Sequence, residues 1–508
     1  MKDRKKVGTP TVSSWWEERR KIQQSIIKPK PAKAEAKIKK AEAKKATANL
    51  PATELSQPAE HEAFLLIGDV HANLPALEAV LEDASNRGVS TIWNVGDLTG
   101  YGAFPDEVVR RLRKEDTQSV VGNYDLKVLK VKEKGKENKE EEAVEKKEPP
   151  EDRNAIKWTY DNLSKKSRKY LKSLPEELRL EAGGKRTLLT HRSPSPGDKQ
   201  IGPETPDESL RELAHLADAD VIIFGHSHIP FSRQVDGVWF INPGGTGRQD
   251  DGDPRASYAI LQVNPFEVNH YHVAYDASIA AAAIRKNGLP EIFAQMILQG
   301  RSPDAVAQEL SKKNESRLEE VRKTARSFGY SDGHSSQVTR LAMRLFDELG
   351  GLHGLGAVER FWLQYAGILH DIGWVEGQKG HHKASLRIIL AEPHLPFDER
   401  ERNIVGSIAR YHRKKLPNKG HPNFAALQRG ERQKVKALSA ILRVADGLDF
   451  TQQSLVKDIT CEVSPEQVIV NCAVSGEAET EKERAMKKGD LFEKVFNRDL
   501  AISLDLVS

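Results

Sequence analysis

Side chains that bind metal ions recur in the first half of this 508-residue chain, each just after a short apolar run. The run at 64–67 is followed by Gly-Asp-Val-His, and the run at 222–224 by Gly-His-Ser-His. A mixture of carboxylate, amide and imidazole donors suits Mn²⁺, Fe or Zn²⁺ better than a metal that prefers thiolates. The set is too large for one tetrahedral ion, but it suffices for two ions that share a carboxylate. The donors are Asp69, His71, Asp97, Asn123, His191, His226 and His228.

The elements that must position these donors alternate along the chain. Helices are predicted over 74–87 and 106–113, and strands over 91–95 and 119–121. This alternation predicts an α/β layered domain. Because ligands of open α/β sheets bind at the carboxyl ends of the strands, we expect the donors to meet at that edge. Two metals about 3.5–4 Å apart there would clamp a phosphate and provide an activated hydroxide for in-line attack.

The sequence blocks that contain these donors resemble the calcineurin-like metallophosphoesterase family, especially its small bacterial and archaeal phosphodiesterases. The blocks are Gly-Asp-Val-His-Ala-Asn at 68–73, Gly-Tyr-Gly at 100–102, Asn-Pro-Gly at 242–244 and Asp-Pro-Arg-Ala-Ser-Tyr at 253–258. The resemblance covers residues 62–302 and implies a dimetal phosphodiesterase domain with two sheets flanked by helices. By the same resemblance, Asp69, His71 and His228 hold one metal. Asn123, His191 and His226 hold the other, and Asp97 bridges both.

The candidate catalytic residues are Asn123, Tyr124, Asp125 and Arg192. Family members usually have His where this chain has Tyr124, and that His contacts the scissile phosphate and can protonate the leaving group. A phenol with a pKa near 10 can donate a hydrogen bond but is poorly matched to proton transfer at pH 7. We therefore expect slow hydrolysis or a requirement for good leaving groups. Arg192, where Gly is common, either grips a phosphate or is solvated or salt-bridged.

A second set of donors lies in the C-terminal part, where the pattern is helical for over 120 residues from about Leu318. His370 and Asp371 end an apolar helix predicted over 361–369, and an adjacent His pair precedes a later helix. Neighbouring His and Asp at a helix end can reach one ion, and helix bundles build metal sites from such inward-facing positions. Near the end, 459–463 and 467–474 predict a small β-hairpin.

Four blocks of this part resemble the HD phosphohydrolase superfamily, specifically the C-terminal HD domain of the exopolyphosphatase/guanosine-pentaphosphatase family. They are Leu-His-Asp-Ile-Gly at 369–373, Gly-His-His-Lys at 380–383, Arg-Tyr-His-Arg at 410–413 and Ala-Asp-Gly-Leu-Asp at 445–449. The resemblance covers residues 318–508 and implies an all-α bundle with one or two divalent metals. The ligands that it implies for the first metal are His334, His370, Asp371 and Asp446. A second ion would be held by His382 and His412.

The sugar-kinase-like half that carries the phosphatase site of that family shows no trace here. The HD domain therefore either hydrolyses a nucleotide or polyphosphate or only binds one, and Lys383 and Arg413 are candidate anion-binding residues. Three functions remain open. The first is a dimetal phosphodiesterase fused to this HD domain. In the second the HD domain is the main hydrolase and the first site is weak, and in the third the protein is a metal-bound anion sensor without turnover.

Composition limits the partners of the chain. Residues 1–60 hold 12 Lys and 3 Arg against 7 Asp and Glu, a net of +8, so the other residues carry −4 of the total +4. This basic tail, 1–61, is expected to be disordered and either solvated or an anchor for nucleic acid or the ribosome.

No apolar stretch approaches the ~20 residues of a membrane span. Two cysteines exclude a disulfide scaffold and fit the cytoplasm. A charged run at 130–152 predicts a surface insertion, and 303–317 a linker.

Overall fold

The computed structural model describes residues 62–131, 150–194, 200–329 and 332–507. The predicted basic tail and most of the charged run at 130–152 lie outside these residues, so the expectations for both stay predictions. Among the described residues, no helix combines the length and the apolar composition needed to cross a membrane.

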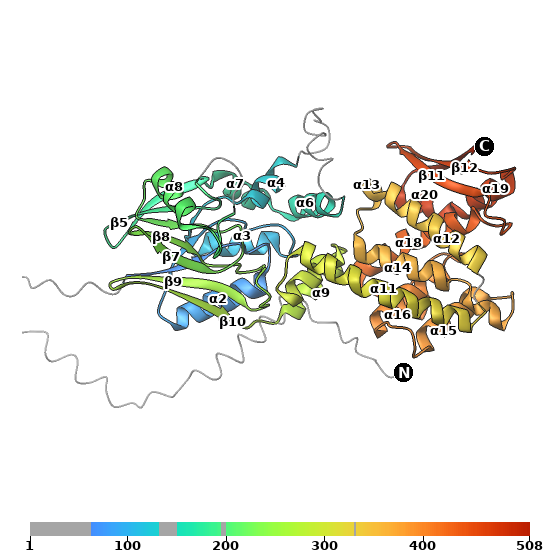
Figure 1. Cartoon of the computed structure of the whole chain (residues 1–508), viewed down its shortest axis with the longest axis horizontal. Coiled ribbons are helices and arrows are strands. Elements are labelled where there is room, and N and C mark those ends of the chain that lie inside the picture. The colour runs from blue at the N-terminus through green and yellow to red at the C-terminus, as the bar shows by residue number, and fades with distance from the viewer. Residues whose placement is uncertain (1–61, 132–149, 195–199, 330–331, 508) are drawn as a thin grey trace, which may run out of the picture. The chain divides into compact units, whose positions relative to one another are not determined.

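Two five-stranded sheets form the α/β part of the protein (Figure 1). Their strand orders are β10-β9-β1-β2-β3 and β4-β5-β6-β8-β7. Strands β1, β2 and β3 run parallel, as do β5, β6 and β8. The strands are β1 Ala63–Ile67, β2 Thr91–Asn94, β3 Gln118–Ser119, β4 Glu177–Ala182, β5 Lys185–Thr190, β6 Val221–Ile223, β7 Phe231–Val235, β8 Val238–Asn242, β9 Ala256–Val263 and β10 Phe266–Val273.

Strand β1 shows why the two sheets stack. Its side chains alternate, and both faces of the strand are buried. Leu65 and Ile67 pack with helices α2 and α3, whereas Phe64 and Leu66 pack with residues of the second sheet. Helix α8 packs on the other face of the second sheet. The result is the expected sandwich of two sheets flanked by helices. The helices of this part are α2 Leu74–Asn86, α3 Pro105–Lys114, α4 Asn123–Lys130, α6 Pro150–Asn162, α7 Lys165–Ser173 and α8 Asp207–Ala217.

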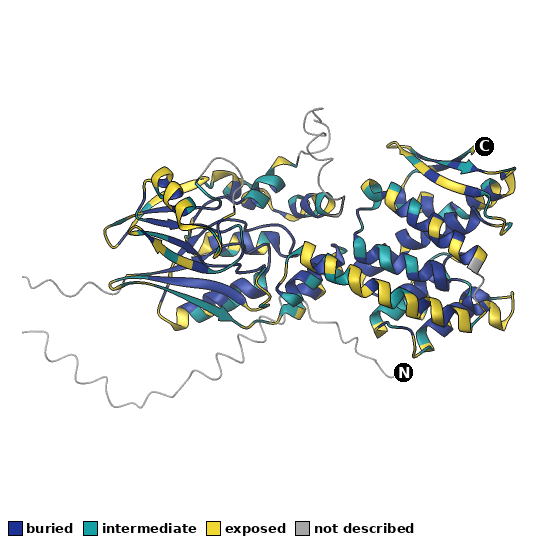
Figure 2. Ribbon diagram, viewed as in Figure 1, coloured by how far each residue is buried: buried dark blue, intermediate teal, exposed yellow. Residues whose placement is uncertain are grey.

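The rest of the chain is mainly helical. Its buried apolar residues between 321 and 502 form one large core (Figure 2), whereas those between 280 and 306 belong to a separate cluster. The segment 303–317, predicted to be a linker, is the first part of the long helix α11. The helices are α9 Ala277–Asn287, α10 Glu291–Gln299, α11 Pro303–Ser327, α12 Asp332–Glu348, α13 Gly350–His353, α14 Ala357–Leu369, η1 Ile372–Glu376, α15 His381–Ala391, α16 Glu399–Arg410, α17 Pro422–Ala426 and α18 Arg429–Gly447.

A three-stranded sheet follows the helices. The expected hairpin is present as β11 (Val456–Val463) and β12 (Gln467–Val474). Two further helices, α19 (Glu479–Lys488) and α20 (Asp490–Phe496), lead to a third strand, β13 (Asp499–Leu506), which the sequence analysis did not predict. Strand β13 pairs in parallel with β12. The crossover through α19 returns the chain to α18, against which α19 packs.

Candidate functional site

Three candidate ligands converge at the carboxyl ends of β1 and β6. The Nε2 atom of His228 lies 3.3 Å from Asp69 Oδ1 and 3.3 Å from His71 Nε2. All three side chains are buried. Their donor atoms lie within 4.8 Å of one another, close enough to hold one metal ion. These are the three residues that the family resemblance assigns to one metal.

The remaining ligands form an adjoining group around Asp97. Its Oδ2 lies 3.4 Å from His191 Nε2 and 3.6 Å from His71 Nε2. The side-chain oxygen of Asn123 lies 2.8 Å from His191 Nε2 and 2.9 Å from His226 Nδ1. The structure thus brings all seven predicted donors together and places Asp97 between the two groups, where a bridging ligand is needed. A further set of donors within 4.8 Å of one another is Asp69, Asp97 and His191.

The backbone of these loops is strained. Five of the seven candidate ligands adopt left-handed conformations that side chains other than glycine rarely take. The φ angles are 50° at Asp69, 45° at His71, 53° at Asp97, 70° at His226 and 57° at His228. Strain of this kind costs on the order of 1 kcal/mol or more for each residue and persists where side chains must be aimed at a ligand. The conformations therefore support a functional role for the strand ends.

Backbone carbonyl groups orient two of the imidazole rings. His71 Nδ1 lies 3.1 Å from the carbonyl oxygen of Thr99, and His191 Nδ1 lies 2.7 Å from that of Val95. Each contact leaves Nε2 directed at the carboxylates. Hydrogen bonds from the far ring nitrogen fix the tautomer and the ring orientation of metal-binding histidines, so both rings are arranged to bind a cation.

The electrostatics of the group also fit divalent metals. Burial by itself raises the pKa of Asp69 and of Asp97, but the nearby imidazoles, chiefly His228 and His191, hold both values below the usual range. Burial lowers the pKa of His191, but Asp97, Asp69 and the Val95 carbonyl together outweigh it and raise this pKa to about 9. Burial lowers the pKa of His71 to about 3. Two ionised carboxylates with converging oxygen and nitrogen donors are a suitable ligand set for divalent cations.

Tyr124 lies beside this centre. Its backbone N–H donates to Asp97 Oδ1 at 2.8 Å, and its phenol is hydrogen-bonded to the phenol of Tyr101. The ring centroid of Tyr124 is 5.4 Å from that of His71. Burial raises the pKa of Tyr124 far above its usual value and that of Tyr101 to about 12. Tyr124 is therefore a neutral phenol near the candidate metals, with a pKa unsuited to proton transfer at neutral pH.

Asp125, a candidate catalytic residue by its place in the sequence, is held by the loops that surround Asp97. It is fully buried, and its carboxylate accepts hydrogen bonds from the backbone N–H groups of Leu98, Thr99 and Gly122 at 3.0–3.2 Å. The Thr99 hydroxyl donates a further bond of 2.7 Å. These contacts tie together the loops that carry Asp97 and its neighbours. Asp125 thus positions the loops around Asp97.

A cavity of about 450 Å³ opens beside Asn123 and His191. Arg192 lines it together with Lys127, Lys130 and two glutamates. Cationic side chains next to metal ligands suit a phosphate group. Both interpretations of Arg192 that the sequence leaves open, phosphate binding and a solvated or salt-bridged side chain, are compatible with this placement.

Two residues beyond the predicted set support His228. Asp250 Oδ2 lies 3.1 Å from His228 Nδ1, and Arg248 Nη2 lies 3.0 Å from the same oxygen. The guanidinium of Arg248 also lies 4.5 Å from the ring centroid of Tyr101. The sequence offered only a weak signal for these residues, namely their position shortly after the Asn-Pro-Gly block. Their role depends on tertiary contacts that the chain pattern does not reveal.

The helical part contains a second centre. His334 Nε2 of α12 lies 3.5 Å from Asp446 Oδ1 of α18, and both form a group with His370 whose donor atoms lie within 4.8 Å. The other ring nitrogen of each histidine is hydrogen-bonded. His334 Nδ1 lies 2.8 Å from Asp449 Oδ2, and His370 Nδ1 lies 2.7 Å from the carbonyl oxygen of Gly367. Within the described residues, the buried Nε2 of His370 has no hydrogen-bond partner, so it is available to a metal.

Asp371 connects this group to a neighbouring one. Its Oδ2 lies 3.5 Å from His370 Nε2 and 3.9 Å from His334 Nε2. Its Oδ1 lies 3.1 Å from His381 Nε2 and 3.6 Å from His412 Nε2, and the donor atoms of these three residues lie within 4.8 Å of one another. A carboxylate with its two oxygens directed at separate histidine pairs is suited to bridging two ions.

His381, not the expected His382, belongs to this second group. The ring of His381 stacks between Trp374 and His412, with centroid distances of 5.1 Å and 5.4 Å. The ring of His382 is nearly perpendicular to that of His412, at 6.4 Å. Successive residues of a helix point in different directions, so only one of the two histidines can face Asp371. The sequence pattern does not determine which one it is.

The charges of the second centre resemble those of the first. Burial opposes ionisation of Asp371, but the neighbouring imidazoles hold its pKa below the usual range. Lys488 has the same effect on the buried Asp446. Burial lowers the pKa of His334 less than its carboxylate neighbours raise it, to about 9, whereas burial lowers that of His412 to about 3. Two ionised carboxylates again face converging imidazoles.

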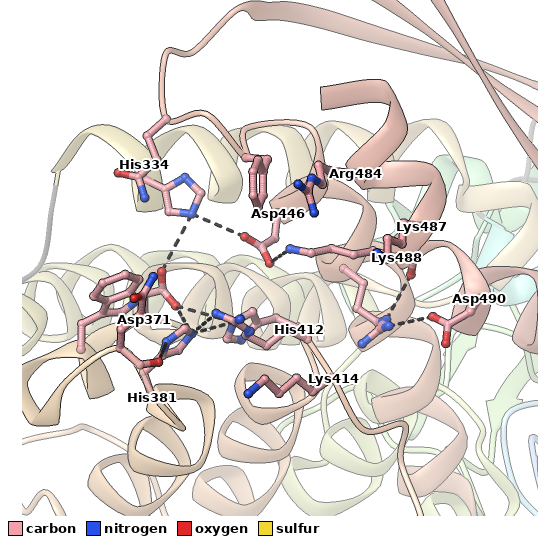
Figure 3. Close-up of a pocket in the computed structure, with 16 residues that line it drawn as sticks. His334, Asp371, His381, His412, Lys414, Asp446, Arg484, Lys487, Lys488 and Asp490 are labelled. Carbon is pink, nitrogen blue, oxygen red and sulfur yellow. Dashed lines mark hydrogen bonds and ion pairs between the residues drawn. The ribbon is translucent and has the colours of Figure 1, made fainter. Parts of the chain in front are cut away.

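A cavity of about 650 Å³ opens at this centre (Figure 3). Arg413 lines it, as expected for an anion-binding residue, but Lys383 is exposed on α15 and is not among the lining residues. Three of the cations come from α19, for which the sequence offered no functional signal. The cationic lining residues are Arg413, Lys414, Arg443, Arg484, Lys487 and Lys488.

Comparisons with known proteins match two segments of the chain to known families. Residues 63–265 match the calcineurin-like phosphoesterase superfamily domain, and residues 317–494 match domain III of the Ppx/GppA phosphatases. An uncharacterized protein of Methanocaldococcus jannaschii is 34% identical over 257 residues, covering 46% of this chain and 97% of that protein. A metallophosphoesterase structure from Sphaerobacter thermophilus is 31% identical. The match covers 47% of this chain and 100% of that chain, with a TM-score of 0.41. A structure from Pyrococcus horikoshii OT3 is 21% identical. The match covers 47% of this chain and 99% of that chain, with a TM-score of 0.43.

The first match contains all seven donors of the first centre, and the second contains the donors of the other centre. The predicted fusion of two phosphatase-related segments is therefore confirmed, while the HD character of the second stays a prediction. The fold and its clustered metal donors make the protein a metal-dependent phosphoesterase. The chain belongs to the calcineurin-like phosphoesterase superfamily.

Proposed function

We propose that the α/β part is a dimetal phosphodiesterase that prefers Mn²⁺. The observation that carries this proposal is the position of Asp97, with one oxygen within 3.6 Å of imidazole nitrogens from two adjoining donor groups. Carboxylate and amide oxygens among the donors favour Mn²⁺ over softer metals. A pair of divalent metals held there supplies Lewis-acid activation of the phosphoester and of the attacking water.

The surrounding side chains bind and orient the substrate. Arg192 and Lys127 line the cavity beside Asn123 and offset the charge of a phosphate. Tyr124 donates a hydrogen bond to the substrate but does not supply the leaving group with a proton, because its pKa lies far above neutrality. This arrangement supports phosphodiesters with good leaving groups as the preferred substrates.

For the helical part, we propose an HD-type centre that binds a nucleotide or polyphosphate through one or two divalent metals. The observation that favours this role is the cationic cavity over the two donor groups that Asp371 connects. Metal ions would add to the positive charge of its lining and attract phosphate. Either binding alone or hydrolysis would satisfy this arrangement, and experiment must separate the two.

One panel of assays tests these proposals. Metal content is measured together with hydrolysis of a phosphodiester, a phosphomonoester, nucleotides and polyphosphate, for the wild type, Asp97→Asn and Asp371→Ala. We expect Asp97→Asn to lose phosphodiester hydrolysis and Asp371→Ala to retain it. Loss of nucleotide or polyphosphate hydrolysis in Asp371→Ala with survival in Asp97→Asn would instead make the HD-type centre the main hydrolase. Stabilisation by the anion without turnover would favour a sensor.

A further inference from the structure

Lys488 contacts a candidate metal ligand inside the large cavity (Figure 3). It is the last residue of α19, and its ammonium forms an ion pair with Asp446 Oδ2. The other oxygen of Asp446 lies 3.5 Å from His334 Nε2. The Asp446 carboxylate therefore lies directly between the positive charge of Lys488 and the metal-binding nitrogen of His334.

The backbone of Lys488 is held firmly. Arg443 of α18 donates through Nε to the carbonyl oxygen of Lys488 at 3.1 Å and through Nη2 to Asp490 at 2.7 Å. Helices α18 and α19 also meet at backbone distance, since a Cβ on Gly447 would lie 2.4 Å from the Cα of Ala485. The end of α19 is thus fixed against α18, and Lys488 is presented to the cavity by a rigid support.

The placement of Lys488 has two electrostatic consequences. Its ammonium competes with a metal ion for the negative charge of Asp446, so it weakens cation binding while the cavity holds no anion. An ammonium has three donor hydrogens, and Lys488 can therefore keep its bond to Asp446 and donate to a phosphoryl oxygen as well. A phosphate bound there would neutralise the repulsion between the ammonium and the metal.

We propose that α19 builds a phosphoryl-binding subsite around Lys488, beside the metal group of His334, His370 and Asp446. Lys488 binds one phosphoryl oxygen of the ligand and makes metal and phosphate binding mutually favourable. Without phosphate, it holds metal affinity down. This inference rests on the proposed anion-binding role of the helical part, and it adds a specificity-determining residue that lies outside the HD-type ligand set.

The test uses the full-length chain with Asp69→Asn and Asp97→Asn, which weaken the first centre. Binding of Mn²⁺ and of inorganic phosphate is measured by calorimetry for this protein and for versions that also carry Lys488→Met or Lys487→Met. Methionine keeps the length of the lysine side chain but removes its charge. Lys487 is the matched control, because it neighbours Lys488 on α19 and lines the same cavity.

We expect Lys488→Met to bind Mn²⁺ about tenfold more tightly without phosphate, and inorganic phosphate about tenfold more weakly in the presence of Mn²⁺. Lys487→Met should change Mn²⁺ affinity much less than Lys488→Met, because Lys487 is exposed and the ion pair with Asp446 is made by Lys488. The opposite signs exclude a merely structural role, which would weaken both. If the parent protein, which carries only Asp69→Asn and Asp97→Asn, binds both ions and Lys488→Met leaves both affinities unchanged, the inference alone is wrong. If the parent binds neither ion, the proposed role of the helical part is wrong and the inference with it.

Discussion

Asp97 and Asp371 occupy corresponding positions in the two centres. One oxygen of Asp97 lies within 3.6 Å of both His71 and His191. The two oxygens of Asp371 are directed at separate histidine pairs. Each aspartate therefore connects two donor groups, and its loss would affect both groups of its centre. The surrounding residues differ between the centres, so predictions for single residues must be made for each.

Tyr124→His should restore proton transfer to the first centre. An imidazole with an ordinary pKa can protonate a poor leaving group, and general acid catalysis of this kind is worth at least about tenfold in rate. We expect the turnover of alkyl phosphodiesters to rise by at least that factor, with little change for p-nitrophenyl esters, whose leaving group needs no proton. The kcat values of both substrate classes, compared with those of Tyr124→Phe, test this. An equal effect on the two classes would contradict the assigned role.

Asp250→Asn should weaken metal binding without removing a metal ligand. Its carboxylate lies 3.1 Å from His228 Nδ1 and orients the ring. Loss of such a partner typically costs about 10–100-fold in metal affinity, and we expect a shift of this size in the Mn²⁺ concentration that supports phosphodiester hydrolysis. Asp251→Asn is the control, because Asp251 lies 3.6 Å from His272 instead. Identical Mn²⁺ dependence in both variants would show that Asp250 has no such role.

At the scale of secondary-structure elements, the first centre was largely predictable. Its ligands directly follow apolar strands, and a local pattern specifies both the strand and the loop that begins after it. The partners that come from elsewhere were not predictable. Arg248 and Asp250 reach His228 from the loop after β8, and Lys488 reaches Asp446 by way of the crossover to β13. Such contacts are set by how elements pack, which no single stretch of sequence encodes.

Gly122→Ala tests how closely two of these loops must approach. A Cβ on Gly122 would lie 2.0 Å from Asp97 Oδ1, so the carboxylate or its loop would have to move. We expect a loss of phosphodiesterase activity of more than about tenfold and destabilisation of about 1–3 kcal/mol, as for other overpacked sites.

The control for this variant is Gly202→Ala. No atom lies within 4 Å of the corresponding Cβ position, among the residues that the structure describes. Thermal unfolding and the kcat for an aryl phosphodiester are measured for both variants. Wild-type behaviour of Gly122→Ala would show that the close approach to Asp97 is unimportant.

For the whole molecule, the sign of the net charge does not predict what the protein binds. The total of +4 combines a tail of +8 with a remainder of −4. Under the proposed functions both centres bind phosphate, because bound dications would reverse the local charge of the buried carboxylates. The sequence predicted two phosphatase-related segments in one chain, and the family matches confirm both. The boundaries between them, at 302 and 318, stay predictions.

Deletion of residues 1–60 should separate nucleic-acid binding from catalysis. The deletion changes the formal charge from +4 to −4, and phosphate contacts by lysine and arginine dominate non-specific affinity. We expect binding to a single-stranded RNA to weaken by at least about tenfold at low salt, with phosphodiester hydrolysis unchanged. Fluorescence anisotropy and an activity assay measure the two properties. A truncated chain that binds RNA as tightly as the full-length protein would assign that binding to residues 61–508.

The most direct test of the central claim is hydrolysis of bis(p-nitrophenyl) phosphate with Mn²⁺ by the wild type and by Asp97→Asn. Asparagine keeps the size of the side chain but removes the charge that lies between His71 and His191. If Asp97 bridges two metals, the variant should lose activity by at least about 10³-fold while remaining folded, since both ions depend on it. Hydrolysis by Asp97→Asn at the wild-type rate would contradict a dimetal phosphodiesterase at this site.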